Sequence, residues 1–545
     1  MDKESAMTYE LKQARTDASK VLLVSGLWPY HEVDEKKSVG RLNIFHNDEL
    51  TTGITGLIGV DSIYDLAIRR EGGTQRLFTP TTSVEPTLVS VALRSLIGDE
   101  ASVTEVELAS VVGGIPASDT SLRAAAKDAV CLLSTSYITN FADLRRVVDN
   151  LRRLHVGYLV VGGYLATRNA ESMLECGADA AIVGDAEHSI APLLAALRGG
   201  ADFGRVPNLR YRDENGEQVY TSDHLVPLDE IPVTIPSGDL TGMSVPYESM
   251  RGCPYKCAFC SYPLVSTKWR FKSAEKLIED WTTIERRGAK DIVALDSTFT
   301  IPPKRLTDFL NLYAESRMTI PWGAYSRVTP LRNEETVIRL KRANNRWLSI
   351  GFESGSQRML DLMKKGTRLK DAYPALANLR KHRISAWSNF IIGYPGETPQ
   401  TVAETVAFMS DHLFGFYGIY VFNIRDRAMP VLSDPQAGVH WDDVGSDWSH
   451  ATMTSGEASE IRWRSYVRVA EQNAEAINID VFRGSNVEKD YGAWSSAFPV
   501  LKLLERWSLR QVDPGMAGLG ARDDLAAIES ELRRRLVPAS GDAIQ

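Results

Sequence analysis

Three of the five cysteines of this chain lie within eight positions, in the segment RGCPYKCAFCSYP at residues 251–263. Cys253, Cys257 and Cys260 have the spacing C-x3-C-x2-C. Four such thiolates would complete a structural zinc site, but no fourth cysteine or histidine lies nearby in the sequence. Three thiolates can hold a [4Fe–4S] cluster and leave one iron open. The segment therefore predicts a cluster whose open iron takes part in chemistry. Gly252 and Pro254 suit a loop that wraps closely around it.

The bulk composition excludes several classes of partner. The chain has 545 residues, 43% of them hydrophobic, and a formal net charge of −8, so no global field attracts nucleic acid or an anionic membrane. No uninterrupted apolar run approaches the ~20 residues of a membrane span, and the polar start lacks a secretory signal. Cys131 and Cys176 stand alone in apolar sequence, which predicts buried, reduced thiols. We expect a cytoplasmic protein with no membrane or nucleic-acid partner.

Apolar strand-like runs alternate with helical patterns between about residues 18 and 200, for example DAVCLLSTSYITN at 128–140 followed by FADLRRVVDNLRRLH at 141–155. This alternation predicts a parallel, doubly wound sheet. Ligands of such sheets bind at the carboxyl ends of the strands. The residues expected there are Ser134, Thr135, Gly162, Gly163, Gly184 and Glu187.

The rest of the chain predicts a second α/β unit. An Asn-Gly pair within 207–223 indicates a β-hairpin, and four prolines follow in a linker-like stretch. A new series of strands and helices then predicts a partial (β/α)6 barrel, with its active groups where the strands end. The final segment has mostly helical patterns. The predicted parts are 1–225, a linker at 226–243, the barrel at 244–430 and a mostly helical domain at 431–545.

RGCPYKCAFC resembles the cluster loop of radical S-adenosylmethionine (SAM) enzymes, with Phe259 as the aromatic residue before the last cysteine. Four supporting motifs follow in family order: LDSTFT at 295–300, YSRV at 325–328, GFESGSQRMLDLMKKGT at 351–367 and FIIGYPGET at 390–398. The resemblance implies that SAM chelates the open iron. The residues that it implies around SAM are Phe259, Ser326, Arg327, Glu353, Ser354, Gly393 and Gly396.

The upstream segment YLVVGGYLATRNAESMLECGADAAIVGDAEHSIAPLLAAL resembles the cobalamin-binding module of one radical SAM subclass. Glycines at strand ends let the backbone approach a large ligand. No histidine stands in the Asp-x-His-x-x-Gly pattern, so the resemblance implies cobalamin without a histidine lower ligand. A doubly wound domain that has lost its cofactor is the alternative interpretation.

Length and plan are most similar to the tryptophan C2-methyltransferases of thiopeptide antibiotic biosynthesis, which supply the quinaldic acid moiety. The resemblance implies that cob(I)alamin takes a methyl group from SAM and passes it to C2 of the L-tryptophan indole. A low-potential donor such as flavodoxin or ferredoxin would keep the cofactors reduced. Arg69 or Arg70 is a candidate for excluding a ligand beneath the corrin, and a surface helix pair is the alternative interpretation. Asp296 and Glu353 are the candidate bases.

Several alternatives stay open. A radical methylase acting on an sp3 carbon is the closest, and it would form 5′-deoxyadenosine at each turnover. An iron–sulfur electron carrier, or a cobalamin scaffold with an inactive barrel, is the non-enzymatic alternative. Glu275 and Glu279 are in reach of the open iron as ligands, or else are helix-surface residues. Trp322 and Trp387 are expected to be structural.

Overall fold

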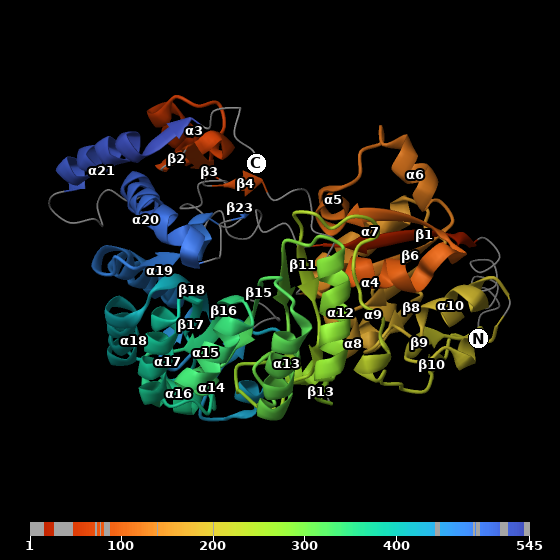
Figure 1. Cartoon of the computed structure of the whole chain (residues 1–545). Coiled ribbons are helices and arrows are strands. Elements are labelled where there is room, and N and C mark those ends of the chain that lie inside the picture. The colour runs from red at the N-terminus through yellow and green to blue at the C-terminus, as the bar shows by residue number, and fades with distance from the viewer. Residues whose placement is uncertain are drawn as a thin grey trace.

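The structure is a computed structural model. It describes residues 16–26, 47–70, 73–76, 78–80, 88–138, 140–199, 201–266, 268–441, 447–482, 485–486, 491–512 and 521–538. Two seven-stranded sheets dominate it, and they lie side by side in Figure 1. No helix of the described segments combines the length and the apolarity needed to cross a lipid bilayer.

The first sheet has the order β10-β9-β8-β7-β6-β1-β5, and β5, β1, β6, β7 and β8 run parallel. Its strands are β1 (Asp17–Ser25), β5 (Ser102–Glu107), β6 (Ala129–Ser134), β7 (Tyr158–Gly162), β8 (Ala180–Ile182), β9 (Leu209–Arg212) and β10 (Gln218–Tyr220). β9 and β10 form the antiparallel hairpin expected from the Asn-Gly pair. Because β1 lies between β5 and β6, the chain winds outward in both directions, as the sequence predicts for a doubly wound sheet.

Alternating side chains of the central strands enter two separate cores, which explains why these strands are apolar throughout. Leu22, Cys131 and Leu159 pack in one core with residues of α5 (Leu108–Gly113) and α7 (Phe141–Arg153). Val21, Val130 and Tyr158 pack in the other with α10 (Ile190–Leu197). Burying apolar side chains on both faces is characteristic of parallel sheets covered by helices. Cys131 and Cys176 are buried free thiols, as predicted.

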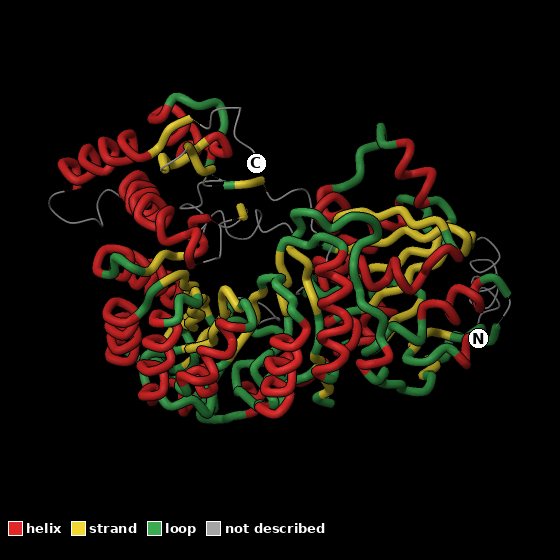
Figure 2. The backbone as a smooth tube through the Cα atoms, viewed as in Figure 1, coloured by secondary structure: helices red, strands yellow, loops and turns green. Residues whose placement is uncertain are grey.

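The second sheet has the order β11-β14-β15-β16-β17-β18-β22, with all neighbours parallel. Its strands are β11 (Ser244–Tyr247), β14 (Asp291–Ala294), β15 (Trp322–Ser326), β16 (Asn345–Glu353), β17 (Ser385–Ile392), β18 (Gly415–Val421) and β22 (Ala476–Asn478). The first six follow chain order, which is barrel topology. The helices that cover their outer side in Figure 2 are α12 (Ala274–Arg286), α13 (Pro303–Ser316), α15 (Glu334–Arg342), α17 (Ala372–Lys381) and α18 (Pro399–His412). The predicted fold class is therefore confirmed.

Two connections link parts of the chain that are far apart in the sequence. β22 lies beyond residue 430 and still adds a parallel strand to the barrel sheet. β2 (Leu66–Arg70) pairs with β24 (Leu536–Pro538) and β3 (Gly73–Arg76), and these strands lie beside α21 (Ala521–Arg535) in Figure 1. The helices α19 (Ser455–Gln472) and α20 (Tyr491–Val512) complete this mostly helical region. The predicted domain limits stay predictions.

Candidate active site

The cysteine loop begins directly after the short strand β12 (Met250–Arg251) at the barrel. Gly252 has φ +78, and a Cβ there would lie 2.8 Å from the carbonyl oxygen of Lys268, so only glycine fits this turn. The Ser297 hydroxyl donates a hydrogen bond to the Gly252 carbonyl at 2.9 Å. At the far end of the loop, the amide of Ala258 donates to the Met363 carbonyl. Hydrogen bonds to two different barrel segments thus hold the backbone of the loop.

The three predicted cluster ligands lie together. The pKa of the Cys260 thiol is raised to about 11, mainly by burial, with contributions from the negative charges of Cys257, Cys253 and Glu353. No set of three or more His, Cys, Asp or Glu side chains in the described ranges is arranged around a single metal ion. Each cysteine of an iron–sulfur cluster binds a different iron, so thiols of a cluster site need not converge on one point. The donor set fits a [4Fe–4S] cluster with one open iron.

Basic and aromatic side chains form the wall beside the cysteines. Arg327 lies with Nη1 3.8 Å from Cys257 Sγ and with its guanidinium 3.8 Å from the centre of the Tyr255 ring. The Lys365 ammonium is 2.7 Å from Glu353 Oε1 and 5.8 Å from the centre of the Phe259 ring. Arg327 also donates hydrogen bonds to the Lys365 carbonyl and to the Thr367 hydroxyl. Positive charge next to a cysteine favours its thiolate form, which is the form that binds iron. Arg327 and Lys365 supply such charge beside the cysteine loop.

Glu353 reaches this wall because of its backbone. It has φ +68, which is unusual for a residue other than glycine. A Cβ at Gly351 would lie 2.3 Å from Glu353 Oε1, so glycine at 351 leaves the space that the carboxylate occupies. Glu353 is 8% exposed and is paired with Lys365. This pairing supports a positioning or SAM-binding role better than a role as a free base.

Asp296, the other predicted base, is 1% exposed. Its Oδ1 accepts a hydrogen bond from the Ser249 amide at 2.7 Å, and its Oδ2 accepts one from the Ser249 hydroxyl. Burial raises the pKa of Asp296 to about 6, and the charge of Arg305 opposes the rise. Arg305 Nη2 donates to the Ser249 hydroxyl at 2.5 Å. The geometry supports a structural role for this carboxylate.

The remaining residues of the predicted SAM motifs mostly form hydrogen bonds or close contacts inside the protein. Ser354 is buried with Oγ 2.9 Å from the Thr405 hydroxyl, and Ser326 Oγ lies 3.0 Å from the Thr300 hydroxyl. Gly393 and Gly396 have φ +90 and +88, and a Cβ at either would lie under 3.0 Å from a neighbouring side chain. These positions shape the site through close packing.

The Gly393 peptide is held by two titratable side chains. Its amide donates to Glu397 Oε2 at 2.5 Å, and its carbonyl lies 3.0 Å from His450 Nε2. Burial raises the pKa of Glu397 to about 7, and the hydrogen bond from Gly393 opposes the rise. His450 stacks on Trp448 with ring centres 5.0 Å apart. The sequence did not point to His450, because it lies far downstream of the motif.

The carboxyl edge of the first sheet offers open space at two of the predicted glycines. A Cβ at Gly162 or Gly184 would meet nothing within 4 Å. Gly163 is different, because it has φ +94 and its Cβ would lie 2.5 Å from Ser136 Oγ. Thr135 is fully buried, and its hydroxyl donates to the Gly162 carbonyl at 2.7 Å. Ser134 is buried at the end of β6. The open glycines fit a ligand that approaches the backbone.

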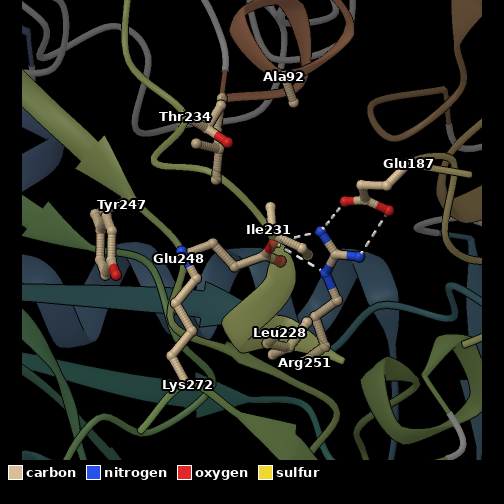
Figure 3. A pocket seen from close by; sticks show the side chains of 10 residues that line it. Ala92, Glu187, Leu228, Ile231, Thr234, Tyr247, Glu248, Arg251 and Lys272 are labelled. Atoms are coloured by element: carbon tan, nitrogen blue, oxygen red, sulfur yellow. Dashed lines mark hydrogen bonds and ion pairs between the residues drawn. The ribbon is translucent and has the colours of Figure 1, made fainter. Parts of the chain in front are cut away.

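Side chains after β7 and β8 contact the barrel around the cysteine loop, so the carboxyl edges of the two sheets face each other. Arg251 is 2.9 Å from Asp185 and 2.5 Å from Glu187, both of which follow β8. Figure 3 shows the Arg251 fork directed at Glu187 on one side and at Glu248 on the other. Glu187, expected at a cofactor, therefore forms an ion pair between the sheets. Glu187, Glu248 and Arg251 also line a small pocket at this place.

Exposed aromatic side chains also lie at this meeting of edges. Tyr325 of β15 is 42% exposed, and Tyr137, after β6, is 40% exposed. Tyr420 of β18 is also exposed. A ring-shaped substrate could lie against such side chains.

Two further expectations change. Arg69 and Arg70 belong to strand β2, not to a surface helix, and their side chains lie outside what the structure describes. Glu275 and Glu279 are exposed residues of the outer helix α12, where Glu279 pairs with Lys276 at 3.2 Å. An outer helix of the barrel does not present carboxylates to the open iron, so the helix-surface interpretation is correct. Trp322 is fully buried against Trp281 and Phe309, as expected for a structural residue.

Comparison with known proteins agrees with this architecture. The model of the radical SAM superfamily matches residues 247–409. An uncharacterized methyltransferase of Pyrococcus horikoshii is 33% identical over 46% of this chain and 57% of its own length. An anaerobic magnesium-protoporphyrin IX monomethyl ester cyclase of Rubrivivax gelatinosus is 25% identical over 43% of this chain and 45% of its own length. The chain thus matches about half the length of these curated relatives.

Two solved structures are similar in fold over most of this chain. The radical SAM methyltransferase TsrM from Kitasatospora setae, with tryptophan and a SAM analogue bound, has a TM-score of 0.58 at 16% identity, over 94% of this chain and 98% of that one. The cobalamin-dependent SAM radical enzyme OxsB, with aqua-cobalamin and SAM bound, has a TM-score of 0.51 at 16% identity, over 96% and 72% of the two chains. At these identities the likeness shows the fold. The chain therefore contains a radical SAM domain, at residues 247–409, within a fold that it shares with these two enzymes.

Proposed function

We propose that this chain is a cobalamin- and [4Fe–4S]-dependent methyltransferase that uses SAM. The observation that carries the proposal is the meeting of two sites: the cysteine loop at residues 253–260 and the glycine-lined edge at Gly162 and Gly184. Arg251 bridges the loops that hold them. A methyl group that moves between two cofactors needs such close and fixed neighbours.

The roles of the residues follow from their places. Cys253, Cys257 and Cys260 would hold the cluster, and Gly162 and Gly184 would leave room for cobalamin. When bound, cobalamin supplies a cobalt that accepts a methyl group from SAM and passes it to an acceptor carbon. Glu353 and Lys365 would orient SAM beside the open iron, because they form the wall next to Phe259.

We propose L-tryptophan as the acceptor, with methylation at C2 of the indole, in thiopeptide antibiotic biosynthesis. The fold shared with a structure that holds tryptophan supports this choice. So do the exposed rings of Tyr137, Tyr325 and Tyr420 at the strand ends. A low-potential donor of the flavodoxin or ferredoxin type would keep the cofactors reduced. We propose that neither Asp296 nor Glu353 removes the indole proton, since both are already engaged by neighbours.

A radical methylase acting on an sp3 carbon is the second candidate. Its support is the fold shared with OxsB, which is described as a radical enzyme. Three cysteine ligands leave an open iron in either case, so the cluster site is compatible with both reactions.

One anoxic assay separates the two. The reconstituted protein is incubated with hydroxocobalamin, a reductant, methyl-deuterated SAM and L-tryptophan, and the products are followed by mass spectrometry. Labelled 2-methyltryptophan equal to S-adenosylhomocysteine, with negligible 5′-deoxyadenosine, supports the first candidate. Untouched tryptophan with accumulating 5′-deoxyadenosine contradicts it and supports the second. The Cys257→Ala variant is the control for chemistry that does not depend on the cluster.

A further inference from the structure

Two arginines connect the cysteine loop to the first domain, one at each end of the loop. Arg251 stands two residues before Cys253 and contacts the loop after β8. Arg168, in α8 (Tyr164–Arg168) after β7, donates to the Leu264 carbonyl at 3.3 Å, four residues after Cys260. Arg168 is also 2.7 Å from Asp426, which follows β18. The loop is therefore held from both sides by the domain that carries the open glycine edge.

The contacts of Arg251 use its whole guanidinium. Nη1 donates to Asp185 at 2.9 Å, Nη2 donates to Glu187 at 2.5 Å, and Nε donates to Glu248 at 3.0 Å. A planar fork with several partners fixes direction as well as distance, which a lysine ammonium cannot do. The side chain of Arg251 is only 17% exposed, so solvent screens these pairs weakly.

A third arginine, Arg270, also contacts the acidic side of the bridge. Arg270 Nη1 is 2.7 Å from Asp185 Oδ2 and also donates to the Val226 carbonyl at 2.6 Å. Although burial opposes it, the hydrogen bond from Arg270 and the charge of Arg251 hold the pKa of Asp185 below its ordinary value. Asp185 directly follows Gly184, one of the two open glycines. The carboxylate is thus bound on both sides at the edge of the first sheet.

We propose that Arg251, with Arg168, is a positioning residue that sets the separation between the glycine edge of the first sheet and the cysteine loop. Asp185 and Glu187 stand one and three residues after the open glycine Gly184, and Arg251 stands two residues before Cys253. A shift in the bridge therefore moves one site relative to the other. Glu187 is thereby assigned to the bridge and not to a cofactor. The kinetic part of the inference rests on the proposed function, whereas the structural part stands without it.

The test compares Arg251→Lys, Arg168→Lys and Glu187→Gln with wild type in the full chain. Arg152→Lys is the matched control, since Arg152 forms a similar 2.8 Å pair with Asp179 inside the first domain. The first readout is hydrogen–deuterium exchange without added cofactor, because local opening reports the loss of contacts that hold a segment. We expect Arg251→Lys to raise exchange in the peptides covering 184–188 and 248–264, and Arg152→Lys to leave them as in wild type.

The second readout uses reconstituted protein with hydroxocobalamin and SAM. Iron content and the Kd for hydroxocobalamin are expected to match wild type in Arg251→Lys. The rate of methyl transfer from SAM to cobalamin, followed by cobalamin absorbance, is expected to fall about tenfold or more, because a displacement of about 1 Å is enough for such losses. The double variant Arg251→Lys, Glu187→Gln should lose little more of the transfer rate than Arg251→Lys alone, since both substitutions act on the same ion pair.

Unchanged exchange at both loops in Arg251→Lys and Glu187→Gln would overturn the inference. So would a rise spread evenly over the chain, or loss of iron from Arg251→Lys, because either shows that the arginine only supports folding or the cluster loop itself. If wild type transfers no methyl group but the two loops still open in Arg251→Lys, the proposed function fails and the positioning role stands. If Arg251→Lys folds poorly, Glu187→Gln still decides the test, since in that variant Arg251 keeps two of its three carboxylate partners.

Discussion

The ammonium of Lys365 lies 2.7 Å from the carboxylate of Glu353, in a buried pair beside the cysteine loop. The two side chains are 7% and 11% exposed. Burying two charges is costly, so a buried pair of this kind is a candidate for a functional role beside the cysteine loop. Glu353 forms this pair with a positive φ of +68, an unusual conformation for a residue other than glycine.

Replacing Lys365 with Met should destabilise the protein by about 3–5 kcal/mol, because it leaves the Glu353 carboxylate buried without its cation. Lys381→Met is the matched control, since Lys381 forms a 2.8 Å pair with Glu334 in which the two side chains are 66% and 42% exposed. That change should cost at most about 1 kcal/mol. Denaturant unfolding of both variants checks the prediction, and equal losses would contradict it.

Replacing any one of Cys253, Cys257 and Cys260 with Ala should remove the cluster from the anaerobically reconstituted protein. Each thiolate binds a separate iron, so none can take over for another. Iron and sulfide analysis with EPR spectroscopy provides the measurement. Cys131→Ala is the control, because Cys131 is buried in the core of the first domain and should leave the iron content at the wild-type level. A cluster retained in Cys260→Ala would show that this thiol is not a ligand.

Replacing Gly162 or Gly163 with Ala should give opposite results. Gly163→Ala should destabilise the apoprotein by about 1–3 kcal/mol, because φ is +94 and a Cβ would lie 2.5 Å from Ser136 Oγ. Gly162→Ala should change stability by less than about 1 kcal/mol, since its Cβ would meet nothing within 4 Å. We expect the latter variant to bind hydroxocobalamin more weakly. Unfolding curves and an absorbance titration measure the two effects, and wild-type affinity in Gly162→Ala would place the ligand elsewhere.

Glu397 should make the stability of the protein depend on pH. Its pKa is raised from 4.5 to about 7, so the native state holds the proton more tightly than the unfolded chain does. The group therefore costs nothing below about pH 4.5, and its cost grows as the pH rises to about 7, up to about 3 kcal/mol. Glu397→Gln removes this cost and keeps an oxygen for the Gly393 amide.

The Gln variant should accordingly be more stable than wild type at pH 8.5 and nearly equal to it at pH 5. Denaturant midpoints of the two proteins across this range provide the measurement. Glu457→Gln serves as the control, because Glu457 is an exposed helix-cap residue with a lowered pKa. A constant difference between Glu397→Gln and wild type at all pH values would show that the carboxyl does not titrate in this range.

The sequence allowed the fold class to be predicted, and it supplies the prediction of the cluster ligands, because both depend on local signals. Apolar runs separated by helical patterns specify parallel strands, and β6 and β7 lie within the stretches so identified. Thiol spacing indicates a cluster because the three ligands come from one short loop. Arg69 shows the limit of such signals. The sequence around Arg69 has no clear hydrophobic periodicity. Its strand, β2, forms by pairing with residues near 537, and no local sequence pattern indicates that pairing.

The sequence by itself determined the central strands of the first sheet, where the cysteine loop lies and which glycines end those strands. Only the tertiary structure decided which side chains meet. Arg251 reaches Asp185 and Glu187 across more than 60 residues, and Arg168 reaches Asp426 across 258. Such contacts depend on how two sheets are oriented toward each other, and that orientation follows from packing and charge pairing over the whole chain. A local sequence pattern contains no information about packing or charge pairing between distant segments.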